Sequence, residues 1–214
     1  MNSTIIQLGR DYPDLTPCLA DIEAAYRLLE AAFSARGKLL VCGNGGSAAD
    51  ADHIVGELVK GFLLKRPVPG AYRQKLETEY AAEGRYLADH LQGGLPAIAL
   101  TAHTALATAF SNDVASDLVF AQQVYAYGRP GDVLIGLSTS GRSANVLHAF
   151  RVARSLGVRT IGLTGQSGGA MMPLCDVLVR VPYDSTPRIQ ERHLPIYHAL
   201  CIALEAAFFA SEGR

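Results

Sequence analysis

Short runs of apolar residues alternate along the chain with longer stretches in which apolar positions recur at helical spacing. Each run is bounded by Gly, Pro or polar residues, which is typical of buried strands rather than helices. The runs cover residues 39–42, 95–101, 133–137, 158–164 and 176–182. Strands that alternate with helices predict an α/β fold. We therefore expect a doubly wound, five-stranded parallel sheet flanked by helices, of the flavodoxin-like type.

Two helical segments lie outside this alternation. Residues 15–36 carry an apolar stripe and are followed by Gly37, so the region 1–37 is expected to hold a long N-terminal helix. Its stripe packs either on its own sheet or on a partner chain. Residues 65–94 are rich in charge with a thin apolar stripe, which predicts an inserted helical arm. With these additions, residues 1–214 are expected to form a single domain.

Composition narrows the classes of function. Hydrophobic residues make up 49% of the chain and charged residues 18%, a balance that favours burial between subunits. The net charge is -1 and the basic residues are scattered, which argues against a nucleic-acid-binding protein. No apolar run is long enough for a membrane span, and the N-terminus is unlike a signal peptide. The cysteines are Cys18, Cys42, Cys175 and Cys201; their wide spacing predicts buried thiols of a reducing compartment, and hence a cytoplasmic location.

The first strand leads into a glycine-rich loop, GNGGS, at residues 43–47. Such a loop lets a ligand approach the main chain, and the helix behind it directs its positive end at an anion. Ser47 is expected to cap that helix. On the same helix His53 and Glu57 are four residues apart, and therefore share one face. They form either a solvated surface pair or a site for a shared metal or proton.

A second loop of small residues, STSGRS at residues 138–143, follows the strand at 133–137. Its hydroxyl groups precede a helix, and the loop lacks the lysine of a nucleotide-binding P-loop. A monoester phosphate therefore suits it better than a nucleotide, although a serine-rich turn has the same composition. Both loops follow the carboxyl ends of strands, where ligands bind in doubly wound sheets.

Several motifs together resemble those of a known family. They are GNGGS followed by HxxxE, SND at 111–113, GDVLIGLSTSGRSANV, IGLTGQSGG, and RIQERHLPIYH at 188–198. In these the chain resembles the sugar isomerase (SIS) domain proteins and, within them, the phosphoheptose isomerases. The resemblance implies an aldose–ketose isomerase that converts sedoheptulose 7-phosphate to D-glycero-D-manno-heptose 7-phosphate through an enediol. It also implies a homotetramer with active sites at subunit interfaces.

The resemblance further implies particular site residues. A zinc ion would be held by His53, Glu57, Gln190 and His198. Glu57 and His198 would be the catalytic residues, with Glu57 as the base. Substrate contacts would fall on Asn44, Gly45, Gly46, Glu57, Asn112, Asp113, Ser138, Thr139, Ser140, Ser143 and Gln190.

One part of this set raises a geometric question. Gln190 and His198 lie on the last predicted helix, about 12 Å of rise and about 80° of rotation apart. Either the helix is distorted before Pro195 or begins near it, or the two residues are pooled from more than one subunit. His193, between them, is expected to have a supporting or structural role.

Two other functions are consistent with the same fold. One is a noncatalytic scaffold of the kind found among replication initiator-associating SIS proteins, which generally lack the full ligand set. The other is a sugar-phosphate sensor, which needs the STSGRS loop but no catalytic base. The arm and Pro187, which stands where an acidic residue is common in the family, are departures that bear on the distal sugar contacts.

Overall fold

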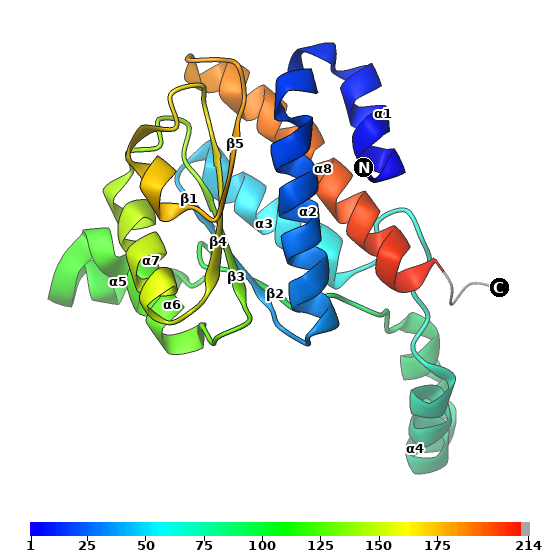
Figure 1. Ribbon diagram of the computed structural model, residues 1–214. Helices are drawn as coiled ribbons and strands as arrows, with labels where there is room; N and C mark the ends of the chain where they lie inside the picture. Colours follow the sequence, from blue (N-terminus) through cyan, green and yellow to red (C-terminus); the bar gives the residue numbers. More distant parts are fainter. Residues whose placement is uncertain (211–214) are drawn as a thin grey trace.

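Five parallel strands, in the order β2-β1-β3-β4-β5, form the centre of the computed structural model, which describes residues 1–210 (Figure 1). The expected α/β architecture is therefore confirmed. The strands are β1 (Leu39–Gly43), β2 (Ala97–Ala99), β3 (Val133–Leu137), β4 (Arg159–Thr164) and β5 (Val177–Arg180). The edge strand β2 is shorter than its apolar run predicts.

The sheet is buried on both faces. In β1, Leu39 and Val41 belong to one apolar cluster, whereas Leu40 and Cys42 belong to the cluster on the opposite face. Successive side chains of a strand point to opposite faces, so a strand covered on both sides needs apolar residues at every position. This is why the strands appear in the sequence as continuous apolar runs.

Helices cover the two faces unequally (Figure 1). Helices α6 (Val119–Tyr127) and α7 (Ala144–Ser155) contribute to one apolar cluster. Helices α1 (Ser3–Asp11), α2 (Leu19–Ser34), α3 (Gly46–Val59) and α8 (Thr186–Phe209) contribute to the other. The short α5 (Thr104–Phe110) has no buried residue. Helices α3 and α8 lie side by side and carry most of the predicted ligands.

The N-terminal region differs from the single long helix that was expected. It consists of α1, a 3₁₀ segment at Pro13–Cys18 and α2. Proline cannot donate a backbone hydrogen bond inside a helix, so Pro13 and Pro17 separate the two α-helices. The stripe of α2, including Ile22, Leu29 and Phe33, is buried in the chain's own core. Of the two packing alternatives, its own domain is the one observed.

The inserted arm is α4 (Gly70–His90), which projects away from the sheet (Figure 1). Ala81 has a φ of 49°, which interrupts the helix and folds it back on itself. Gly84 packs against the Leu76 carbonyl so closely that a Cβ there would lie 1.9 Å from its oxygen. The arm is therefore a helical hairpin. Its predicted apolar stripe is not buried as one continuous face, since Leu76 is buried whereas Tyr80, just before the fold, is exposed.

Two local predictions are wrong. Gly45, with a φ of 58°, precedes the first residue of α3, so Ser47 lies inside the helix and does not cap it. Asn112 and Asp113, whose polar, turn-favouring side chains predict the end of the helical or irregular segment after residue 101, instead lie within a π-helical turn, Ser111–Ala115. The long last helix is observed as α8, from Thr186 to Phe209, and it continues through Pro195, so the alternative of a helix that starts near the proline does not apply.

Other expectations hold. The sequence places Gly157 after the helix that follows STSGRS as its stop signal, and it adopts a φ of 73° directly after the C-cap of α7. All the cysteines are free thiols, and all except the half-buried Cys175 are buried. Within residues 1–210, no helix combines the length and apolar character that crossing a bilayer requires.

Candidate functional site

The two small-residue loops lie next to each other because their strands are neighbours. Gly43, the last residue of β1, pairs in register with Leu137, the last residue of β3. In a sheet of this strand order the crossover direction reverses between β1 and β3, and ligands of such folds bind at that switch point. Fold topology thus brings the predicted anion loops to one ligand-binding edge.

Side chains connect the loops directly. The carboxamides of Asn44 and Asn145 exchange two hydrogen bonds of 2.9 Å, which join the GNGGS loop to the first turn of α7. Within the second loop, the hydroxyls of Ser138 and Ser143 are 2.9 Å apart. These contacts hold the loop ends in place. Asn145 lies within the GDVLIGLSTSGRSANV motif but was not among the predicted site residues.

His53, Glu57 and His198 come together where α3 and α8 lie side by side. The Nε2 atom of His53 is 3.2 Å from a carboxylate oxygen of Glu57. The His53 and His198 rings are 5.0 Å apart, centroid to centroid, and nearly perpendicular. The His53 side chain is 43% exposed, whereas that of Glu57 is 12% exposed. The cluster is therefore reachable from solvent on its His53 side.

His198 lies in a more apolar setting than His53. The Phe62 ring is 5.3 Å from the His198 ring, and the Nε2 atom of His198 is buried without a hydrogen-bond partner within residues 1–210. Burial lowers the pKa of His198, and nearby His53 adds to this effect while Glu57 opposes it. A neutral imidazole with an unused ring nitrogen can bind a metal or accept a proton.

Gln190 does not join this cluster within one chain. From α8, its carboxamide packs against the start of α3, where a Cβ added at Gly46 would lie 2.7 Å from the Gln190 amide nitrogen. About 12 Å of helix separates it from His198, and α8 continues unbroken between them. In the described part of the chain, no three His, Cys, Asp or Glu side chains are arranged as a ready-made metal site.

The other predicted substrate contacts are mostly exposed. The Asn112 amide donates to Asp113 at 2.9 Å, and both side chains face solvent on the turn that follows α5. Thr139 is half-buried, with its hydroxyl 3.5 Å from that of Thr186, and Ser140 is exposed. The GNGGS loop, the STSGRS loop and the turn at Ser111–Ala115 all come after the carboxyl end of a strand. Within residues 1–210, however, no side-chain hydrogen bond joins Asn112 or Asp113 to either loop.

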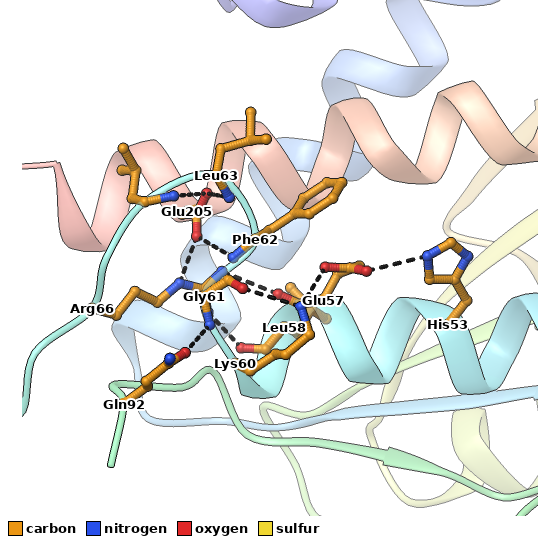
Figure 2. A network of polar contacts seen from close by, with 11 residues as sticks. His53, Glu57, Leu58, Lys60, Gly61, Phe62, Leu63, Arg66, Gln92 and Glu205 are labelled. Carbon is orange, nitrogen blue, oxygen red and sulfur yellow. Dashed lines mark hydrogen bonds and ion pairs between the residues drawn. The ribbon is translucent and has the colours of Figure 1, made fainter. Parts of the chain in front are cut away.

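Sequence reasoning missed a buried ion pair behind the cluster (Figure 2). Glu205 accepts hydrogen bonds from the backbone amides of residues 62–64 and from Nε of Arg66. Arg66 in turn donates to the carbonyl oxygens of Glu57 and Leu58 at the end of α3. The pair therefore holds the segment that places Phe62 on His198. A single arginine and a single glutamate in different segments carried no motif by which to find it.

A second missed feature lies on the other side of His53. The Tyr197 hydroxyl is 3.0 Å from Nδ1 of His53 and donates to Asp50 at 3.1 Å. Lys60 extends to Glu57, with its ammonium 3.3 Å from the carboxylate. Asp50 lies three residues before His53 on α3, and Tyr197 lies within the RIQERHLPIYH motif, but neither feature of the sequence indicated that the two side chains meet.

His193 is buried completely, in keeping with the structural role expected of it. Neither of its ring nitrogens has a hydrogen-bond partner in residues 1–210. Burial lowers the pKa of His193 to about 4. The imidazole is therefore neutral near pH 7.

Comparison with known proteins identifies what the chain is similar to. The SIS domain family model matches residues 18–72 and 76–165. A phosphoheptose isomerase of Rhodospirillum rubrum is 45% identical over 193 residues, which span 90% of this chain and 89% of that protein. The structure of phosphoheptose isomerase GmhA from Neisseria gonorrhoeae is 35% identical, with a TM-score of 0.73 over 94% of this chain and 93% of the other. That of a phosphoheptose isomerase from Francisella tularensis is 34% identical, with a TM-score of 0.74 over 93% and 91%.

Proposed function

The chain belongs to the SIS domain family, and from this we propose that it is a phosphoheptose isomerase, which converts sedoheptulose 7-phosphate to D-glycero-D-manno-heptose 7-phosphate. The proposal draws on relatives of that name that match nearly the whole chain. The observation that carries it is the cluster of His53, Glu57 and His198, formed where α8 meets a helix that begins at the glycine-rich GNGGS loop.

The chemistry requires a base that reaches two adjacent carbons. Glu57 takes the proton from C1 of the ketose while the C2 carbonyl oxygen gains a proton, which gives the enediol. Glu57 then delivers its proton to C2, and the O1 hydroxyl loses its proton as the aldehyde forms. His198 moves the proton between the two oxygens. Its lowered pKa, caused by burial, suits a group that must both accept and release a proton.

The donor types gathered in this cluster suit a zinc ion, which His53, Glu57 and His198 would hold. His53 Nε2 and a Glu57 oxygen are 3.2 Å apart, and His198 has an unused, buried ring nitrogen nearby. Imidazole and carboxylate are ligands that zinc accepts, with one position left open in catalytic sites. When bound, the ion would act as a Lewis acid toward the carbonyl oxygen. Gln190 joins His53, Glu57 and His198 only where subunits pool residues.

Remote binding energy positions the reacting carbons. Ser138, Thr139, Ser140 and Ser143 bind the phosphate at the start of α7, where backbone amides and the helix dipole favour an anion. Asn44, Gly45, Gly46 and Gln190 line the neighbouring loop and contact the sugar, and Asn112 and Asp113 approach it from the π-helical turn after α5. The enzyme is a cytoplasmic homotetramer in this proposal, with active sites at subunit interfaces.

The direct test is a coupled assay with ketose phosphates of different chain length. We expect turnover of sedoheptulose 7-phosphate, and a loss of about 10²- to 10⁴-fold in kcat when Glu57 is replaced by Gln. Turnover of a shorter ketose phosphate in preference to the heptulose would move the substrate assignment. Binding of sugar phosphates without turnover would instead support a sensor, and neither binding nor turnover would support a scaffold.

A second experiment tests the metal. Protein purified without chelator should contain zinc or a similar ion, lose activity after treatment with a chelator, and regain it when zinc is returned. A metal-free protein with full activity would remove zinc from the proposal while leaving Glu57 and His198 in their roles.

A further inference from the structure

Two residues that the proposed reaction does not use directly, Tyr197 and Asp50, form a hydrogen-bonded series behind His53. The Tyr197 hydroxyl lies between the Asp50 carboxylate, 3.1 Å away, and Nδ1 of His53, 3.0 Å away. Tyr197 is only 2% exposed and reaches across from α8, whereas Asp50 and His53 are on α3. This series of hydrogen bonds therefore connects α3 and α8, the two helices that carry the predicted metal ligands.

The number of protons available fixes the direction of these hydrogen bonds. A phenol has one proton, and an ionised carboxylate can only accept. Within residues 1–210 the Tyr197 hydroxyl is the only hydrogen-bond donor to the Asp50 side chain, whereas Glu57 also receives a bond from Lys60. The phenol proton is therefore directed to Asp50. The phenol oxygen is then left as an acceptor, and its neighbour His53 must carry a proton on Nδ1.

This tautomer determines which nitrogen of His53 faces the site. With the proton on Nδ1, the Nε2 atom has its lone pair free, and Nε2 is the atom 3.2 Å from the Glu57 carboxylate. A lone pair that faces a carboxylate is repelled unless a cation or a proton lies between them. The geometry thus leaves at Nε2 and Glu57 the arrangement that a divalent cation stabilises.

We propose that Tyr197 and Asp50 are positioning residues that keep the proton of His53 on Nδ1 and so present Nε2 to the metal ion. Partners of this kind commonly orient metal-binding histidines and strengthen them as ligands. The proposal rests on the metal site of the proposed function, but its consequences are measurable without any substrate.

The first measurement is of the tautomer itself. In metal-free protein labelled with nitrogen-15 histidine, at a pH where free imidazoles are neutral, NMR should show the proton of His53 on Nδ1. The signal is assigned by its absence in the variant His53→Gln. In Tyr197→Phe the proton should move to Nε2, where it can bond Glu57. A wild-type His53 with an unprotonated Nδ1 overturns the proposal.

The second measurement is of zinc affinity by competition with a chelator. Tyr197→Phe should bind zinc about 10- to 100-fold more weakly than the wild type, and Asp50→Asn should show a smaller loss in the same direction. The matched control is Tyr183→Phe, which removes another phenol-to-carboxylate hydrogen bond, the 2.7 Å bond to Asp14. It should leave zinc affinity unchanged.

These outcomes separate the inference from the proposed reaction. Equal zinc affinities for Tyr197→Phe and Tyr183→Phe overturn the inference, as does a wild-type protein that binds no zinc, whether or not the heptulose phosphate is turned over. Conversely, zinc binding that is weaker in Tyr197→Phe but unchanged in Tyr183→Phe, with unchanged thermal unfolding, supports the inference even if the substrate is a different sugar phosphate.

Discussion

Arg66 and Glu205 form an ion pair of 2.8 Å in which the side chains are 0% and 1% exposed. Arg66 follows α3 in the sequence, and Glu205 lies near the end of α8 (Figure 2). Because each charge satisfies several backbone groups as well as its partner, the pair fixes the path of residues 60–66. That path places Phe62 against His198 and brings Lys60 to Glu57.

Replacement of Glu205 by Ala should destabilise the protein strongly. Removing one member of a buried ion pair leaves the other charge without compensation, which typically costs about 3–5 kcal/mol. The free energy of unfolding, measured by urea denaturation, should fall by about this amount. The control is Glu79→Gln, which removes an exposed partner of Lys75 on the arm and should change stability little. A Glu205→Ala variant as stable as this control would contradict the assigned role.

The same carboxylate should make stability depend on pH in the acid range. Burial alone would raise the pKa of Glu205, but the amides of Phe62 and Leu63 and the Arg66 guanidinium outweigh it and hold the pKa below the ordinary value of 4.5. A depressed carboxyl pKa stabilises the fold above that value, and the contribution is lost as the pH falls through the folded-state pKa. In urea titrations below pH 4.5, the difference in stability between wild type and Glu205→Gln should therefore shrink. If the stability difference between the two proteins stays constant with pH, the depressed pKa of Glu205 is not a source of the acid dependence.

His193 should act over a different pH window. Burial lowers its pKa from 6.5 to about 4, so between these values the unfolded chain binds a proton that the folded chain does not. Stability should fall by about 3 kcal/mol as the pH drops through this window. His193→Leu removes the titrating group, so its stability should vary less between pH 6.5 and pH 4. Parallel curves for the two proteins in thermal unfolding would show that His193 titrates normally.

The sequence predicted the sheet well because strands buried on both faces leave a pattern that needs no tertiary information. Residues 133–137 were predicted as a strand with the bounds that β3 has. Where the outcome depended on a single backbone angle, the prediction failed. A positive φ at Ala81 is unexpected for a residue with a Cβ, and it turned one predicted helix into a hairpin. Similarly, Gly45 took the position before α3 that was assigned to Ser47 as a cap.

The site was predictable in part for the same reason. Helical spacing placed His53 and Glu57 together, and the structure brings His198 to them across the α3–α8 contact. What spacing could not show was the partner of each residue across that contact. Tyr197 reaches Asp50 and His53 only because α8 lies against α3 in one register, and that register is set by packing across the whole domain.

The contact between Gly46 and Gln190 gives a prediction about this register. A Cβ at position 46 would lie 2.7 Å from the Gln190 amide nitrogen, so Gly46→Ala must displace the carboxamide. We expect KM for the sugar phosphate to rise while stability changes little, since the side chain that moves is flexible. The control is Gly56→Ala on the same helix, where a Cβ meets no atom within 4 Å. There, helix propensity alone should add about 1 kcal/mol of stability and leave KM unchanged.

Double substitution distinguishes displacement of Gln190 from damage to the loop. If Gly46→Ala acts by moving the carboxamide, adding it to Gln190→Ala should cause no further rise in KM, because the group it displaces is already absent. Two contacting residues are then strongly non-additive in a double-mutant cycle. Additive effects on KM would mean instead that the methyl group disturbs the main chain of the GNGGS loop, and that Gln190 contacts the sugar independently of its place beside Gly46.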